Sequence, residues 1–259
     1  MEYIITGSTG FIGSNLLETL LKKKFRKIIL INRNSFQKRN IFKNNKIINL
    51  SLNEFLKTKI NYKNFIFYHL ATFYKPKIKE ISDIEKTINS NIDFSLEAII
   101  HFKKNNGEKI IYTRSYQELN KNKGLYSLSK ITLHEAITTL NFKKYCYVFI
   151  YDTYGENDRR NKFLDISINS ILNKKPITLE YKNINIYLTS IKDVIRGLLQ
   201  LKTFNSQGYS LRTNKTITLE NIIFKLSKII NKKCVIEYKN NKINEYELPK
   251  IKKTEELER

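Results

Sequence analysis

Two side chains that can exchange protons stand four residues apart in the middle of the chain. Tyr126 and Lys130 lie in the run Leu125-Tyr-Ser-Leu-Ser-Lys130. In a helix, residues at this spacing share one face and lie one turn apart. Tyrosine and lysine both serve in general acid–base chemistry, so the pair is a candidate for proton transfer. The same spacing also occurs at the start of ordinary amphipathic helices, and its meaning depends on the other motifs of the chain.

A glycine-rich segment near the N-terminus supplies that second motif. Three glycines lie in the run Thr6-Gly-Ser-Thr-Gly-Phe-Ile-Gly13, after the apolar stretch Tyr3–Ile5 and before the helix-like run Asn15–Leu21. Strand, turn and helix in this order are the setting of the dinucleotide-binding fingerprint. Its first glycine permits a tight turn, its second lets the backbone approach a pyrophosphate, and its third lets the helix pack on the strand. The sequence therefore predicts that phosphates bind at the start of the helix near Phe11.

Together the two motifs resemble the extended short-chain dehydrogenase/reductase family, also called the NAD-dependent epimerase/dehydratase family, and in particular its nucleotide-sugar branch. In that family a tyrosine exchanges a proton with a carbonyl or carbinol oxygen, and a serine or threonine hydroxyl hydrogen-bonds the same oxygen. A lysine lowers the pKa of the tyrosine and binds the nicotinamide ribose. The resemblance assigns these roles to Tyr126, Ser115 and Lys130. It also implies that Asn91, on a long helix, supports the active site.

Two further segments resemble the cofactor site of the family. His69-Leu-Ala-Thr72 is similar to the family's HLAA segment, whose backbone lines the cofactor, and His69 itself is expected to be structural. The second apolar strand ends in Asn32-Arg33, without the acidic residue that holds the ribose hydroxyls of NAD. An arginine at this place favours the extra phosphate of NADP. We therefore expect NADP(H), with NAD(H) as the alternative.

The segment Tyr151–Lys162 looks like the family's NVYGP corner in the form found in CDP-abequose synthase-like 4-ketoreductases. The resemblance implies that the backbone at Asp152 and Thr153 passes close to the nicotinamide. It also implies that Arg160 and Lys162 meet the diphosphate of a nucleotide sugar. The expected cofactor-binding residues are Gly7, Thr9, Gly10, Phe11, Ile12, Gly13, Arg33, Leu70, Ala71, Thr72, Tyr126, Lys130, Asp152 and Thr153. The expected substrate-binding residues are Ser115, Tyr126, Arg160 and Lys162, and no metal site is expected.

Departures from the family pattern help to choose the reaction. Dehydratases carry an Asp-Glu pair directly after the catalytic hydroxyl residue, where this chain has Tyr116-Gln117, and no cysteine of the GDP-fucose type follows Ser115. By elimination we expect NADPH-dependent reduction of the 4-keto group of a nucleoside-diphosphate 6-deoxyhexose, for surface polysaccharide sugars. A nucleotide-sugar C4 epimerase remains open. A non-catalytic NADP-binding regulator also remains open, because Glu156 stands where proline is usual in the family.

Short apolar runs alternate with amphipathic ones through the first half of the chain, which is typical of a parallel sheet covered by helices. We expect an α/β fold: a doubly wound Rossmann sheet in residues 1–160 and a smaller α/β substrate lobe, mainly in residues 161–259, with elements interleaved. The lobe is expected to contain a strand pair near Ile177–Leu179 and Ile184–Leu188. Family members continue with a last helix where this chain ends. The expected strands of the first part are Tyr3–Ile5, Lys27–Ile31, Lys46–Leu50, Phe65–His69, Lys109–Thr113 and Tyr145–Tyr151, and the clearest helices are Ser14–Lys23, Ile84–Lys103 and Ser127–Leu140.

Composition narrows the class of protein. The net charge is +23, but only nine of the 47 basic residues are arginine and the lysines are scattered. Nucleic-acid surfaces favour arginine and a concentrated patch, so no specific nucleic-acid partner is expected. No apolar stretch approaches the length of a membrane span, and the two cysteines lack metal spacing, so we expect a cytoplasmic protein. Relatives often dimerise through the two long helices, and a homodimer is expected.

Overall fold

The computed structural model describes residues 1–32, 45–75, 78–120, 123–204, 207–240 and 242, and the backbone of residues 255–256. The chain forms two compact units. The first comprises Met1–Ile150, Lys192–Leu211 and Ile251–Arg259, and the second comprises Tyr151–Ile191 and Arg212–Lys250. The first segment of the first unit ends at Ile150, ten residues before the expected boundary at 160. Residues 192–211, which lie in the range expected to be mainly the lobe, belong to the first unit.

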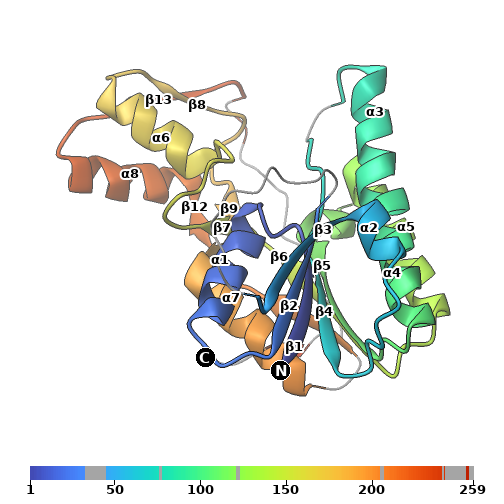
Figure 1. Ribbon diagram of the computed structural model, residues 1–259. Helices are drawn as coiled ribbons and strands as arrows, with labels where there is room; N and C mark the ends of the chain where they lie inside the picture. The colour runs from blue at the N-terminus through green and yellow to red at the C-terminus, as the bar shows by residue number, and fades with distance from the viewer. Residues whose placement is uncertain are drawn as a thin grey trace. The chain divides into compact units, whose positions relative to one another are not determined.

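A parallel sheet forms the centre of the first unit (Figure 1). Within the described residues its strands run in the order β3-β2-β1-β4-β5-β6-β11-β14, and all neighbouring strands are parallel. The first six of these follow the order of a doubly wound Rossmann sheet, so the expected fold class is confirmed. The strands are β1 (Glu2–Thr6), β2 (Lys27–Asn32), β3 (Ile47–Ser51), β4 (Phe65–His69), β5 (Lys109–Ser115), β6 (Lys144–Ile150), β11 (Gln207–Leu211) and β14 (Glu255–Glu256).

Both faces of this sheet are covered, which explains its continuous apolar strands. The four residues Ile28–Ile31 of β2, for example, are all buried. The helices α1 (Phe11–Leu21) and α7 (Ile191–Gln200) lie on one side of the sheet, and α4 (Phe94–Lys104) and α5 (Leu125–Thr139) lie on the other (Figure 1). The short α2 (Leu52–Leu56), which begins at a Ser51–Glu54 capping box, follows β3 and was not predicted. The 3₁₀ turns η2 (Tyr116–Leu119) and η3 (Leu201–Thr203) complete the unit.

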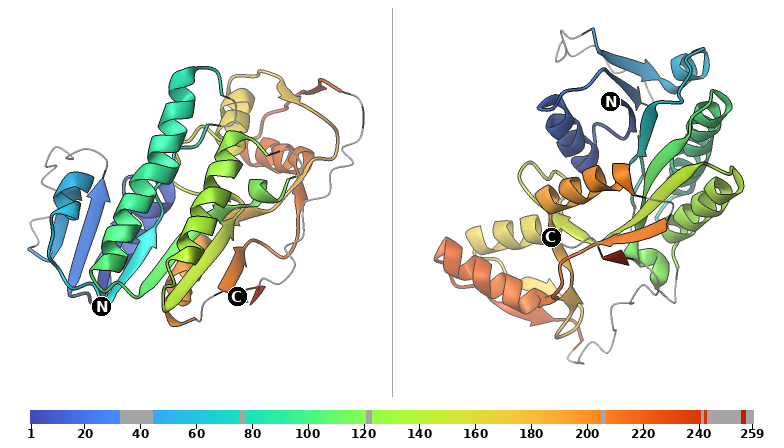
Figure 2. Two further views of the ribbon diagram at one scale, coloured as in Figure 1. Left: turned by 90° about the vertical axis from the view of Figure 1, so that its right-hand side faces the viewer. Right: turned by 90° about the horizontal axis from the view of Figure 1, so that it is seen from below.

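The long helix expected at Ile84–Lys103 is interrupted. Its parts are α3 (Ile81–Ile88), a π-helical turn η1 (Asn89–Asp93) and α4. Figure 2 shows the three as one continuous column beside α5. A π turn inserts one extra residue into the helix and often occurs at functional sites. Here it places Ser90 and Asn91 in the protein interior.

The second unit has its own small core, made of Ile171, Ile177, Leu179 and Ile223. The expected pairing of Ile177–Leu179 with Ile184–Leu188 is wrong. Instead β8 (Ile177–Leu179) pairs with β13 (Ile236–Tyr238), and β9 (Asn185–Ile186) pairs with β12 (Ile217–Thr218). The remaining elements are β7 (Asp152–Tyr154), which pairs with β10 (Leu188–Ser190), and the helices α6 (Phe163–Leu172) and α8 (Leu219–Ile230). Throughout the described part of both units, every helix is too short or too polar to cross a membrane.

Candidate active site

The glycine-rich loop joins β1 to α1 in a conformation that requires glycine. Gly7 has φ of +71°, and a Cβ there would lie 2.7 Å from the backbone nitrogen of Ala71. A Cβ on Gly13 would lie 2.0 Å from the carbonyl oxygen of Gly7. That carbonyl also accepts a hydrogen bond of 3.0 Å from the backbone nitrogen of Gly10. The loop therefore packs tightly at the point between β1 and β4 where the strand order reverses, and the first turn of α1 follows directly.

These features fit the pyrophosphate of a dinucleotide. Close backbone approach and the amide groups at a helix N-terminus are what that group needs. The residues of the predicted phosphate site, from Gly7 through Thr9, Gly10, Phe11 and Ile12 to Gly13, all lie in this loop and first turn.

Thr6 and His69 tie the ends of β1 and β4 together beside the loop. The Thr6 hydroxyl oxygen accepts hydrogen bonds from the backbone nitrogens of Leu70 (3.2 Å) and Ala71 (3.3 Å). Its own hydrogen is then left for Nδ1 of His69, 2.9 Å away. His69 accordingly carries its proton on Nε2, a buried atom without a hydrogen-bond partner among the described residues. Burial lowers the pKa of His69 to about 3, and the charge of Lys130 acts in the same direction. A neutral, fully buried ring agrees with the structural role expected for it.

An amide group, and not a carboxylate, stands at the end of β2. The Asn32 side chain donates to Oδ1 of Asn49 at 2.6 Å and accepts from the Ser8 hydroxyl at 3.4 Å. The acidic residue that would bind the ribose hydroxyls of NAD is absent from this strand end. Arg33, on which the NADP expectation depends, lies outside the described residues.

The hydroxyl of Tyr126 is hydrogen-bonded by the side chains of Ser115 and Thr72. Ser115 is the last residue of β5, and Tyr126 lies in the first turn of α5. Burial raises the pKa of Tyr126, and so does the negative charge of Glu118, whereas side-chain hydrogen bonds with Ser115 and Thr72 lower it. The ring packs edge-on against Tyr74, with centroids 4.9 Å apart. The phenol is therefore protonated at neutral pH and has two hydroxyl partners, as a proton donor to a substrate oxygen requires.

Lys130 lies one turn after Tyr126 and is 3% exposed. Its ammonium donates to the carbonyl oxygen of Thr113 at 3.2 Å. Burial lowers the pKa of Lys130 to about 8, which the negative charge of Glu118 opposes and the positive charge of Arg114 assists. At neutral pH the side chain is thus mainly a cation. The three residues expected to be catalytic come together in the first unit, and their roles remain a proposal.

Asn91, in the π turn, holds two sides of this site. Its Oδ1 accepts from the backbone nitrogen of Phe73 (2.6 Å) and from the Thr72 hydroxyl (3.3 Å). Its Nδ2 donates to the carbonyl oxygen of Phe73 and to the Ser129 hydroxyl, both at 3.0 Å. Ser129 in turn donates to the carbonyl oxygen of Tyr126 at 2.8 Å. Asn91 therefore links the segment after β4 to the first turn of α5.

Four neighbours of the site were not predicted to belong to it. Gln117, which stands in place of the glutamate of dehydratases, donates to the Tyr74 hydroxyl at 3.2 Å. Arg114 and Glu118 form a buried ion pair of 2.7 Å. The sequence holds a signal for Glu118, since Ser115-Tyr-Gln-Glu118 has the spacing of a capping box. Tyr74 has no such signal, because it lies in an irregular segment.

The remaining expected residues belong to the second unit. Arg160 donates to both carboxylate oxygens of Asp158 (2.7 and 2.6 Å) and to the backbone and side-chain oxygens of Thr153, each at 2.9 Å. Asp152 lies opposite Leu188 in the pairing of β7 with β10. The backbone nitrogen of Lys162 donates to Asp165 at the start of α6. Arg160 is thus oriented by its own loop, and a diphosphate-binding role for Arg160 and Lys162 stays a prediction.

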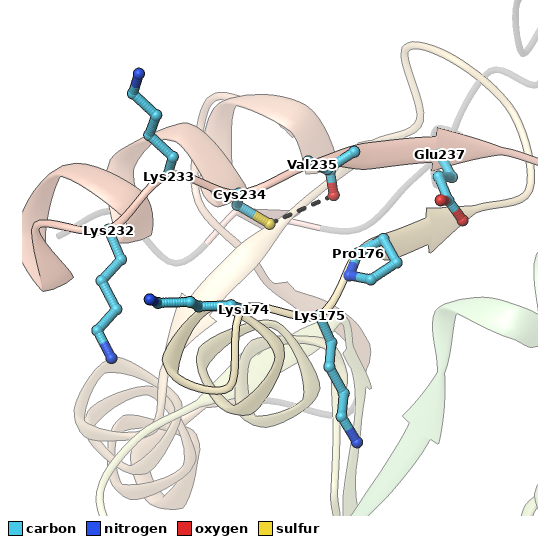
Figure 3. A pocket seen from close by; sticks show the side chains of 8 residues that line it. All are labelled: Lys174, Lys175, Pro176, Lys232, Lys233, Cys234, Val235 and Glu237. Carbon is cyan, nitrogen blue, oxygen red and sulfur yellow. Dashed lines mark hydrogen bonds between the residues drawn. The ribbon is translucent and has the colours of Figure 1, made fainter.

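A surface pocket of the second unit contains none of these residues. Its lining consists of Lys174, Lys175, Pro176, Lys232, Lys233, Cys234, Val235 and Glu237. The lysine side chains point in different directions and share no common centre (Figure 3). In the described part of the chain, no cluster of histidine, cysteine and acidic residues could hold a metal ion.

Comparisons with known proteins agree with this architecture. CDP-abequose synthase of Yersinia pseudotuberculosis is 23% identical over 229 residues, which cover 85% of this chain and 78% of that protein. The UDP-glucuronic acid 4-epimerase of Bacillus cereus superposes with a TM-score of 0.78 at 19% identity, over 94% of this chain and 87% of that one. The UDP-glucose 4-epimerase of Thermotoga maritima superposes with a TM-score of 0.75 at 16% identity, over the same shares. The model of the NAD dependent epimerase/dehydratase family matches residues 3–210. The chain belongs to this family.

Proposed function

We propose that this protein is an NADPH-dependent reductase of a 4-keto nucleoside-diphosphate 6-deoxyhexose. One observation carries the proposal: the side chains of Ser115 and Thr72 hydrogen-bond the hydroxyl of a protonated Tyr126. The buried Lys130 lies one helical turn away. A phenol that remains protonated is suited to deliver a proton to a carbonyl oxygen as that oxygen gains negative charge. The similarity to CDP-abequose synthase supports a nucleotide sugar as the substrate.

Each residue has one task in this mechanism. Ser115 would donate a hydrogen bond to the C4 oxygen and orient the carbonyl, and Tyr126 would give that oxygen its proton. Lys130 would stabilise the tyrosinate that remains, because a positive charge close to a phenol lowers its pKa. The loop from Gly7 to Gly13 would hold the dinucleotide, which when bound would supply the hydride for C4. Arg160 and Lys162 are our candidates for binding the substrate diphosphate.

The choice of NADPH rests on the end of β2. Asn32 offers no carboxylate to ribose hydroxyls, and Arg33 follows it. NAD(H) is the alternative, because the Bacillus cereus epimerase was solved with NAD. Binding constants for NADPH and NADH in the wild-type protein and in Arg33→Ala test the choice. We expect Arg33→Ala to weaken NADPH selectively, and an equal affinity for both cofactors in the wild type would contradict the proposal.

A C4 epimerase is the second candidate, since several solved structures of similar fold are 4-epimerases. The two reactions differ in their use of cofactor. A reductase consumes NADPH in proportion to substrate, whereas an epimerase interconverts two sugars without net consumption. We further propose a homodimer in the cytoplasm, which size-exclusion chromatography with light scattering and cell fractionation would test.

The deciding experiment follows NADPH and NADH oxidation with 4-keto-6-deoxy sugars that carry CDP, dTDP or GDP. Consumption of NADPH with one of them, lost in Tyr126→Phe and kept in the control variant Tyr238→Phe of the second unit, would support the reductase. Interconversion of UDP-glucose or UDP-glucuronic acid without net consumption would indicate the epimerase. Cofactor binding without either reaction would favour a regulator that has lost turnover.

A further inference from the structure

One buried ion pair beside the proposed active site has no role in the mechanism above. The side chains of Arg114 and Glu118 are only 12% and 1% exposed. Removing charges from water is costly, and a buried pair often contributes little net stability. Such a pair is therefore worth examining for a role other than stability. Arg114 and Glu118 flank Ser115 in the sequence, at the end of β5 and in η2.

Both oxygens of the Glu118 carboxylate are engaged. Oε1 accepts a hydrogen bond from the backbone nitrogen of Ser115 at 2.6 Å. Oε2 accepts from Nε of Arg114 at 2.7 Å and contacts its Nη2 at the same distance. The Arg114 guanidinium lies over the rings of Phe149 (4.8 Å) and Tyr147 (5.3 Å), which hold it in place. The Glu118 carboxylate is thus held at one oxygen by the Arg114 guanidinium and at the other by the backbone nitrogen of Ser115, the proposed catalytic serine.

Lys130 lies against the same end of β5, because its ammonium donates to the carbonyl oxygen of Thr113 at 3.2 Å. The charged groups that act on this buried ammonium are Glu118 from η2 and Arg114 from β5. Lys130 in turn acts on the neutral His69 of β4, and Tyr126 lies one turn before it on α5. Glu118 favours the ammonium form of Lys130 and Arg114 disfavours it, and the effect of Glu118 is the larger. Burial alone favours the neutral amine.

We propose that Glu118 is a positioning residue of the active site: held by Arg114, it fixes the backbone at Ser115 and provides the negative charge that faces the buried Lys130. The inference rests on the proposed function, because it assigns a task relative to the same serine, tyrosine and lysine. Its physical basis is that a lysine that lost its proton could no longer stabilise a tyrosinate.

The test is the titration of Lys130 itself, measured without substrate or cofactor. Protein labelled with ¹³C at lysine Cε is followed by NMR as a function of pH, and the Lys130 signal is assigned from its absence in Lys130→Arg. Glu118→Gln keeps an oxygen for the Ser115 backbone nitrogen but removes the charge. We expect its Lys130 midpoint to fall by roughly one pH unit. A merely structural role of Glu118 would leave the midpoint unchanged.

Two further variants keep the test decisive. The double variant Arg114→Gln/Glu118→Gln removes both charges of the pair, so Arg114 is not left without its partner and the variant provides the readout if Glu118→Gln does not fold. Its midpoint should also fall, but by less, because the repulsion from Arg114 is removed as well. The matched control is Glu108→Gln, which breaks the ion pair of Glu108 with Lys143 and should leave the Lys130 midpoint unchanged. An unchanged or higher midpoint in the folded Glu118 variants would overturn the proposal.

Activity provides an independent readout. Because Glu118 also raises the pKa of Tyr126, its loss should move the alkaline limb of kcat/KM for reduction to lower pH. If the wild-type protein reduces no nucleotide sugar, the proposed function fails while the Lys130 titration still decides on Glu118. If the wild type is active and Glu118→Gln leaves both the midpoint and the alkaline limb in place, the inference fails alone.

Discussion

The side-chain nitrogen of Asn91 lies 3.0 Å from the hydroxyl of Ser129, and this contact joins the π turn η1 to the helix that carries Tyr126 and Lys130. The other atoms of the same amide bind the backbone of Phe73 on the opposite side. Asn91 is 1% exposed, so these bonds are shielded from bulk water. The arrangement of the proposed catalytic groups thus depends on one buried amide in an irregular helical turn.

Replacing Asn91 should disturb the site although Asn91 is not itself a proposed catalytic residue. Asn91→Ala leaves the backbone groups of Phe73 without their partner, and a buried polar group left unpaired costs about 1–3 kcal/mol. We expect a loss of unfolding free energy of this size in urea, together with a lower kcat. The exposed neighbour Asn89→Ala, in the same turn, should change the free energy by no more than about 0.5 kcal/mol. If Asn89→Ala lowered the unfolding free energy and kcat as much as Asn91→Ala, the buried amide of Asn91 would not be needed to hold the site together.

The π turn also shows what sequence reasoning could and could not provide. The six strands β1 to β6 were predicted to within two residues at either end, because buried parallel strands are continuous runs of β-branched and aromatic residues. The strands β11 and β14 were not among the strands expected for this sheet. The interruption of the long helix was not predicted, because one extra residue hardly changes its hydrophobic period. Asn91 was nevertheless assigned to the site through family resemblance.

Long-range pairing and the burial of charge were the harder problems. The partner of Ile177–Leu179 is Ile236–Tyr238, and nothing local in either segment identifies the other. The spacing of Arg114 and Glu118 is visible as an i, i+4 pair, but such pairs are exposed by default. Their burial became evident only from the aromatic side chains of β6, which neighbours β5 in the sheet.

The glycine-rich loop allows a matched comparison of two glycines. Gly13→Ala would bring a Cβ within 2.0 Å of the Gly7 carbonyl oxygen, whereas a Cβ on Gly124 would meet nothing within 4 Å. Overpacking of this kind costs about 1–3 kcal/mol or more, and moving the loop should abolish dinucleotide binding. We expect Gly124→Ala, where φ is −78°, to be tolerated. Calorimetric titration with NADPH and NADH and thermal unfolding of both variants check this prediction. Undiminished binding by Gly13→Ala would show that the glycine-rich loop does not hold the dinucleotide.

His69 should make the folded state sensitive to acid. Its pKa is about 3 in the folded protein against 6.5 for a free side chain, so below pH 6.5 the unfolded chain binds a proton that the folded chain does not. Stability is therefore complete above pH 6.5 and falls as the pH decreases towards 3, by up to about 1.4 kcal/mol per pH unit. His69→Asn can still accept from Thr6 but does not titrate. In urea unfolding between pH 7 and 4, the unfolding free energy of the variant should depend less steeply on pH than that of the wild type. If the two free energies differed by the same amount at every pH, the prediction would be wrong.

Arg160 and Arg159 are neighbours with different surroundings, which makes them a test of substrate binding. Arg160 is oriented by Asp158 and Thr153, and a preoriented guanidinium suits a diphosphate. Arg160→Gln should raise KM for the nucleotide sugar roughly tenfold or more, since hydrogen bonds to charged groups contribute about 1.5–3 kcal/mol. The cofactor affinity should be kept, and the exposed Arg159→Gln should change neither constant. If KM stays unchanged in Arg160→Gln, or rises equally in Arg159→Gln, Arg160 does not bind the diphosphate, and its bonds to Asp158 and Thr153 serve only to shape the loop.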